Sequence, residues 1–182
     1  MAETATTAEG AVDRRDFLTI LAGAGGLLAS AAIAWPLIDA LAPHGDAAAG
    51  ERMIVTISDI AENSAITVYW AGLPIYVRKL TAQQISANQN TVPSTLPDPA
   101  TYAARVQPGY ESFVVVVGLN TATPCMLEGN AATDPRGPFD GWLSPCDGSA
   151  YDPLGRVRAG PARRNLAIPP YKFLNANQIQ LG

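Results

Sequence analysis

An uncharged segment near the N-terminus most constrains what this chain can fold into. From Phe17 to Ile38 the sequence reads FLTILAGAGGLLASAAIAWPLI, without Asp, Glu, Lys or Arg. A helix needs about 20 apolar residues to cross the roughly 30 Å hydrocarbon core of a membrane. The segment therefore predicts one transmembrane helix over residues 16–42.

The residues before this segment predict its orientation and its export route. Arg14 and Arg15 stand directly before a Gly/Ala-rich apolar run, which is typical of a twin-arginine export signal. Positive charge on this side places residues 1–15 in the cytoplasm, so we expect the rest of the chain in a bacterial periplasm, anchored in the lipid of the inner membrane. A cleaved signal peptide is the alternative. Its apolar region is usually about 7–15 residues long, whereas this run continues through Trp35 and Pro36, which favours an uncleaved anchor.

Composition allows a globular domain behind the anchor. The chain has 182 residues, of which 48% are hydrophobic and 15% charged, enough for one ordinary domain and an appendage. The net charge is −4 and the basic residues are dispersed, which argues against nucleic acid as a partner because its phosphates require a concentrated basic face. Small residues at 43–50 predict a flexible tether, and residues 51–182 form the exported domain.

The exported domain has the sequence pattern of an all-β fold. Residues 65–80 predict a hairpin around Ala71-Gly72, and SFVVVVGL at residues 112–119 predicts a buried strand. Residues 81–110 are polar and contain prolines, so we expect a surface insertion with one short helical piece. No βαβ alternation is present, which favours a small antiparallel β domain. Further short strand candidates lie between Gly, Pro and Asp residues: RMIVTI, GWLS, SAYD, GRVR, NLAIP, YKF and IQLG.

The cysteine content predicts a disulfide. Cys125 and Cys146 are the only cysteines, and His44 is the only histidine. Outside the cytoplasm two cysteines most simply pair, and closing a loop of this size would stabilise the domain by roughly 3 kcal/mol. A reactive dithiol and a metal site are the alternatives. The sequence contains neither a C-x-x-C motif at a helix start nor a Cys/His set with zinc spacing.

A series of motifs in a specific order gives the chain a family resemblance. They are RRDFL, WPLI, LPIYVRK, G-W-x-S-P-C-x-G-S-x-Y-D, GRVRAGPA, NLAIPPYKF and IQLG. From Asp13 to Gly182 the chain resembles the Rieske iron-sulfur subunit of the ubiquinol:cytochrome c oxidoreductase, the cytochrome bc complex, of proteobacteria. The resemblance implies a small antiparallel β sandwich of Rieske type, with a cluster-binding subdomain at about residues 118–162, on a single N-terminal transmembrane helix.

The chain departs from this family at the positions that hold the cluster. The family carries C-T-H-x-G-C and C-P-C-H-G-S, in which one Cys and one His of each motif bind a 2Fe–2S cluster and the remaining cysteines form a disulfide. Laid on this chain, the motifs fall on residues 120–125 and 144–149, and the resemblance implies a Cys125–Cys146 disulfide. Other residues occupy the four ligand positions: Asn120, Ala122, Ser144 and Asp147.

These replacements cannot supply the chemistry of the cluster. A Rieske centre needs two thiolates on one iron and two imidazoles on the other, and Asp147 would place a hard carboxylate where a soft site expects nitrogen. We therefore expect no 2Fe–2S cluster, no other metal and no catalytic residue. The resemblance assigns Ser149 and Tyr151 to hydroxyl positions that donate hydrogen bonds to the cluster. Here we expect both hydroxyls to bond to the backbone or to fill the pocket, together with the polar residues at the ligand positions.

The resulting functional hypothesis is a cluster-less Rieske-like subunit with a structural or regulatory role. Its expected partners are the cytochrome b and cytochrome c subunits of a respiratory cytochrome bc complex, or a supercomplex of it with a terminal oxidase. The chain itself would transfer no electrons. One alternative is a free-standing membrane-tethered binding module. The other is an electron-transfer subunit that uses another centre, such as a Cys125/Cys146 dithiol.

Overall fold

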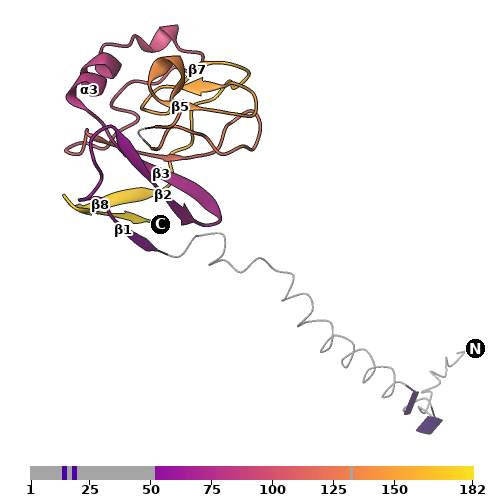
Figure 1. Ribbon diagram of the computed structural model, residues 1–182. Coiled ribbons are helices and arrows are strands. Elements are labelled where there is room, and N and C mark those ends of the chain that lie inside the picture. Colours follow the sequence, from indigo (N-terminus) through magenta and orange to yellow (C-terminus); the bar gives the residue numbers. More distant parts are fainter. Residues whose placement is uncertain (1–13, 16–17, 20–51, 132) are drawn as a thin grey trace, which may run out of the picture. The chain divides into compact units, whose positions relative to one another are not determined.

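The computed structural model describes four stretches of the chain (Figure 1), residues 14–15, 18–19, 52–131 and 133–182. Within these stretches, no helix combines the length and the apolar character needed to cross a bilayer. The predicted transmembrane helix over residues 16–42 falls almost entirely outside them. The predicted tether at 43–50, which contains His44, lies wholly outside.

Nine strands in the described part of the chain form three antiparallel sheets of three strands each. The first sheet has the order β1 (Met53–Thr56), β9 (Gln178–Leu181) and β8 (Tyr171–Asn175). The second contains β2 (Ser64–Trp70), β3 (Leu73–Lys79) and β4 (Phe113–Val117). The third contains β5 (Trp142–Leu143), β6 (Ala150–Tyr151) and β7 (Val157–Ala159). The all-β antiparallel prediction is confirmed.

Strands β3 and β4 of the β2–β3–β4 sheet are buried on both of their faces. In β3, Ile75 and Val77 pack with residues of β1 and β9, whereas Tyr76 between them packs with Trp142 and Leu154 on the other side. Figure 1 accordingly shows β2 and β3 between β1 and β8 at one end of the domain and β5 and β7 at the other. A strand covered on both faces needs no polar alternation. This explains the run of valines in β4 and confirms the buried strand predicted at residues 112–119.

The predicted hairpin at residues 65–80 is also confirmed. Trp70 pairs with Leu73 across a two-residue turn, in which Ala71 has φ 50° and Gly72 has φ 75°. Two successive positive φ values are typical of the tight turns whose twist matches that of the flanking strands. The turn fixes the register that sends Tyr76 toward the third sheet.

The surface position predicted for residues 81–110 holds for most of the segment, since more than half of its residues are exposed. The predicted short helix is present as α3 (Ala82–Gln89), begun by a capping box between Thr81 and Gln84, and a 3₁₀ turn follows at Pro93–Thr95. However, several residues of this segment have less than a tenth of their surface exposed: Gln84, Asn88, Leu96, Arg105 and Val106.

Hydrogen bonds to distant residues explain how the polar residues in this group can be buried. Arg156 Nη2 donates to Asn88 Oδ1 at 2.8 Å, and Arg105 donates to the carbonyl oxygens of Leu154 at 3.0 Å and Leu166 at 2.8 Å. Polar groups are tolerated inside a protein when each finds a partner. Polarity therefore predicted the exposure of most of the segment, but not the burial of these hydrogen-bonded residues.

One predicted strand is absent from the described residues. The NLAIP segment at 165–169 has no strand, although the Val117 amide donates to Ala167 O at 2.8 Å and the Leu166 amide donates to Gly155 O at 2.8 Å. Pro169 at its end and Pro170 directly after it have no N–H and cannot extend a ladder. Each of the other short candidates contains a strand.

Candidate functional site: the former cluster position

Two loops carry the sequence-predicted site residues. The loop at 119–126 follows β4, and the loop at 144–149 joins β5 to β6. A disulfide connects Cys125 to Cys146, with a Cα–Cα distance of 6.4 Å, so the predicted pairing is confirmed. Backbone bonds also close each loop on itself. The Asn120 amide donates to Cys125 O at 2.9 Å, and the Ser144 amide donates to Ser149 O at 2.8 Å.

The side chain of Asn120 lies at the centre of the site. Its Nδ2 donates to Asp147 Oδ2 at 2.6 Å and to Ser144 Oγ at 3.2 Å. Its Oδ1 accepts from the Tyr151 hydroxyl at 2.7 Å. Asn120 is 5% exposed, and Ser144 and Tyr151 are more deeply buried. The structure thus brings three of the four residues at the ligand positions into direct contact.

Ala122 is the ligand-position residue that the side-chain network leaves out. It is exposed, and its backbone amide donates to Asn120 Oδ1 at 3.4 Å. A methyl side chain offers no donor or acceptor. This position therefore contributes only its backbone to the site.

The two retained hydroxyls have protein partners. Ser149 Oγ accepts a hydrogen bond from the Ala162 amide at 3.1 Å. The Tyr151 hydroxyl accepts from the Thr121 amide at 3.2 Å while donating to Asn120. Both side chains are fully buried, so these bonds satisfy groups that would otherwise be costly to bury.

Thr121 is a site residue that the sequence analysis missed. Its Oγ1 lies 3.0 Å from the Tyr151 hydroxyl and donates to Arg164 O at 2.9 Å. The threonine therefore connects the first loop to the chain after Gly160-Pro161-Ala162. Thr121 lies between the ligand positions 120 and 122 in the sequence, and this position could have identified it as a site residue.

Asp147 supplies the carboxylate of the network. Desolvation by burial acts to raise its pKa, but hydrogen bonds from the Ser149 amide and from the side chains of Asn120, Ser144 and Ser149 outweigh this and lower the pKa to about 2. Such bonds favour the charged form. The carboxylate is therefore ionised at any physiological pH, and it accepts hydrogen bonds without accepting a proton.

The residues at this position do not fit a 2Fe–2S cluster. The four ligand positions offer an amide, a methyl, a hydroxyl and a carboxylate, whereas the cluster needs two thiolates and two imidazoles. The amide of Asn120 and the carboxylate of Asp147 are bonded to each other and do not stand open as ligands. Within the described ranges, no group of three or more His, Cys, Asp or Glu side chains could hold a metal ion.

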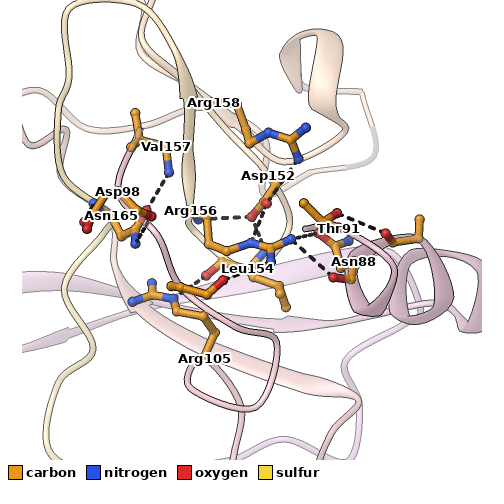
Figure 2. A network of polar contacts seen from close by, with 12 residues as sticks. Asn88, Thr91, Asp98, Arg105, Asp152, Leu154, Arg156, Val157, Arg158 and Asn165 are labelled. Atoms are coloured by element: carbon orange, nitrogen blue, oxygen red, sulfur yellow. Dashed lines mark hydrogen bonds and ion pairs between the residues drawn. The ribbon is translucent and has the colours of Figure 1, made fainter. Parts of the chain in front are cut away.

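A buried ionic network lies next to the site in the chain (Figure 2). Asp152 directly follows Tyr151, and its Oδ2 accepts from Arg156 Nε at 2.7 Å, with both side chains at most 1% exposed. Arg158 approaches the same oxygen at 3.5 Å from a more exposed position. Because Arg156 also binds Asn88, the network connects α3 to the β6–β7 turn. The sequence analysis did not predict this network.

Comparisons with known proteins place the chain in a family. Residues 4–44 match a family model described as "Ubiquitinol-cytochrome C reductase Fe-S subunit TAT signal", which confirms the predicted twin-arginine signal. The chain is 43% identical over 179 residues to the ubiquinol-cytochrome c reductase iron-sulfur subunit of Rhodospirillum rubrum, covering 98% of this chain and 97% of the relative. The subunit of Bradyrhizobium diazoefficiens is 41% identical, with 93% and 94% covered.

A more distant relative and one solved structure are also similar. The iron-sulfur subunit of Cereibacter sphaeroides is 34% identical, covering 93% of this chain and 95% of the relative. A chain of the structure titled "Hyperthermophilic respiratory Complex III" is 25% identical, with 88% of this chain and 98% of that chain covered and a TM-score of 0.49. The identities over nearly full length show that this chain belongs to the ubiquinol-cytochrome c reductase iron-sulfur subunit family.

Proposed function

We propose that this chain is a cluster-less Rieske-like subunit of a cytochrome bc complex, with a structural or regulatory role. In this proposal it is held in the inner membrane by residues 16–42, presents its β domain to the periplasm, and contacts the cytochrome b and cytochrome c subunits. One observation carries the proposal. Asn120 and Asp147, which stand at two of the ligand positions, are hydrogen-bonded to each other at 2.6 Å inside an otherwise retained frame.

The retained frame supports a role in assembly over a role in redox chemistry. The Cys125–Cys146 disulfide, the buried hydroxyls of Ser149 and Tyr151 and the turn at Gly160 are all present. The similarity to the iron-sulfur subunits covers nearly the whole of each relative. A chain that has kept the domain and lost the donor atoms is suited to docking without electron transfer.

The chemistry of the site points the same way. A redox centre of the family type would need thiolates and imidazoles, and none of the four positions supplies one. Asp147 is ionised with a pKa of about 2, the balance of opposing desolvation and stronger hydrogen bonding. A group with so low a pKa is a poor proton acceptor near neutral pH. Asn120, Ser144 and Asp147 therefore hold two loops together and take up neither an electron nor a proton.

Purification from native membranes tests this proposal directly. The complex would be extracted in mild detergent through an affinity tag on this chain, and its iron content, its low-temperature electron paramagnetic resonance after reduction and its subunits by mass would be recorded. We expect cytochrome b and cytochrome c subunits to accompany the chain, and the chain itself to carry no iron. The subunit of Rhodospirillum rubrum, tagged and purified in the same way, is the positive control for cluster retention.

Two results would overturn the proposal. The first is a stoichiometric 2Fe–2S signal that belongs to this chain after any other iron-sulfur subunit has been removed. The second is the absence of cytochromes under conditions in which the control retains them, which would favour a free-standing binding module.

A further inference from the structure

Two independent connections join the loops of the former cluster position. At their base, the backbone bridge between Glu128 and Leu143 holds the segments from which the loops emerge. Beyond this base, the covalent and hydrogen-bonded connections between loops 119–126 and 144–149 in the described structure are of two kinds. One is the Cys125–Cys146 disulfide, and the other is the side chain of Asn120.

We propose that the Asn120 side chain is a metal-free cross-link that takes over the mechanical task of closing these two loops, and that the loops remain closed when the disulfide is reduced. The inference rests on the proposed function in one respect, since it requires a site without a cluster. It goes beyond that function because it assigns the closure to one residue and separates it from the redox state of the cysteines.

The bonding of Asn120 supports this assignment. A side-chain amide has two N–H donors and one carbonyl acceptor, and all of these are used across the two loops and β6. Both donors act on the second loop, to Asp147 and Ser144, while Oδ1 accepts from Tyr151. The bond to Asp147 is charge-assisted and short, which is the stronger kind of hydrogen bond. Burial of Asn120 and Ser144 further strengthens the network, because little water competes for its members.

The disulfide is differently placed and acts by a different mechanism. Cys146 is exposed and Cys125 is half-buried, so the bridge lies nearer to solvent than the Asn120 network. A disulfide stabilises mainly by restricting the unfolded chain. Its reduction should therefore lower the global stability of the domain without removing a contact that the folded loops need.

Amide hydrogen exchange followed by mass spectrometry tests the inference on the full chain in detergent. Exchange is measured in peptides that cover 119–126 and 144–149 for the unmodified protein with and without a dithiol reductant, and for the Cys125→Ala/Cys146→Ala, Asn120→Ala and triple variants. Thr123→Ala is the matched control, because Thr123 lies in the same loop and is exposed. Iron content is measured on each preparation.

We expect reduction and the double cysteine variant to change exchange in the two loops by less than about threefold. Asn120→Ala should raise exchange there by about tenfold or more, because a charge-assisted bond and two buried partners are lost. Thr123→Ala should behave as the unmodified protein does. The triple variant should exchange fastest in these peptides.

Each other outcome overturns the inference. If reduction alone opens the loops as far as the triple variant does, the disulfide and not Asn120 closes them. If Asn120→Ala exchanges like Thr123→Ala, the side chain is not a cross-link. Stoichiometric iron in the unmodified protein would overturn both this inference and the proposed function, whereas iron-free protein with open loops would overturn the inference alone. If Asn120→Ala fails to fold, the inference is tested by comparing exchange in the oxidised and the reduced unmodified protein. Opening of the two loops on reduction would overturn it.

Discussion

Three arginine side chains are buried in the domain, and their charges are accommodated in different ways. Arg156 is paired with the carboxylate of Asp152 at 2.7 Å. Arg105 donates to backbone carbonyl oxygens. Arg78 also donates to carbonyl oxygens, and its guanidinium lies 4.3 Å from the centroid of the Trp142 ring; desolvation, followed by repulsion from a neighbouring arginine, lowers its pKa to about 9.

The pairing of Asp152 leads to the first prediction. Asp152→Asn should lower the free energy of unfolding by about 3–5 kcal/mol, because it leaves the Arg156 guanidinium buried without its counter-charge. Denaturant unfolding followed by circular dichroism measures the change. Arg158→Ala is the control, since its contact with the same oxygen is 3.5 Å and its side chain is 26% exposed, and it should cost at most about 1 kcal/mol. Equal losses in the two variants would contradict the prediction.

Burial of Tyr76 predicts an alkaline loss of stability. Desolvation, with smaller contributions from Tyr69 and Asp134, raises the pKa of Tyr76 from 10.0 to about 12. Between these values the unfolded chain has lost a proton that the folded chain keeps, so stability present below pH 10 falls as the pH rises toward 12. Unfolding free energies measured between pH 8 and pH 11.5 should show this fall.

Tyr76→Phe is the variant that isolates this effect. It removes the hydrogen bond from the hydroxyl to Leu127 O, 2.7 Å long, and should cost about 1 kcal/mol at pH 8. Its stability should then decline less steeply above pH 10. The pKa of Tyr171 is also raised to about 12 by desolvation and affects both proteins alike, so identical slopes in the two would rule the explanation out.

At the scale of elements, Gly141 allows β5 and β6 to pack closely. A Cβ at this position would stand 2.1 Å from the carbonyl oxygen of Tyr151 and 2.3 Å from the carbonyl carbon of Asp152. Backbone atoms cannot move aside as the end of a side chain can. Gly141→Ala should therefore destabilise the domain by about 3 kcal/mol and disturb the loop at 144–149.

A matched glycine separates this clash from backbone strain. Gly148 has φ +72°, and a Cβ there would meet no atom within 4 Å. Gly148→Ala should cost about 1–2 kcal/mol from the unfavourable φ alone. Thermal unfolding of both variants measures the difference, and a larger loss at Gly148 than at Gly141 would contradict the steric explanation.

At the scale of the whole molecule, the domain should fold without metal and still retain the frame of a cluster site. Reconstitution of the purified chain with iron and sulfide is expected to leave it essentially iron-free. Restoring the four ligands with Asn120→Cys, Ala122→His, Ser144→Cys and Asp147→His should allow uptake of about two irons per chain. Iron analysis and visible absorption measure the uptake. Stoichiometric uptake by the unmodified chain would show that the donor argument is wrong.

Much of the fold could be predicted from local sequence. The hairpin follows from Ala71-Gly72 between two β-rich runs, and the buried strand β4 follows from its unbroken valines. These features depend on turn geometry and on burial, which neighbouring residues determine. The pairing of Cys125 with Cys146 required only that two cysteines be present in an oxidising compartment.

The sequence predicted which residues form the candidate site, but it did not predict the hydrogen bonds between them. The resemblance identified Asn120, Ala122, Ser144 and Asp147, yet the central place of Asn120 and the contribution of Thr121 could not be deduced from it. Whether an amide at residue 120 bonds to a carboxylate at residue 147 depends on how two loops are brought together. Similarly, the burial of Asn88 in α3 depended on its contact with Arg156, far along the chain.

By itself, the sequence determined the class of the domain, its hairpin and its buried central strand, its disulfide and the loss of the cluster ligands, because each depends on residue type and near-neighbour pattern. Only the tertiary structure decided that Gln84, Asn88 and Arg105 are buried, that Asp152 neutralises Arg156, and that Asn120 binds both Asp147 and Tyr151. The physical reason is that a polar side chain can be buried only where a partner is supplied. That partner comes from a distant part of the chain, whose position no local pattern specifies.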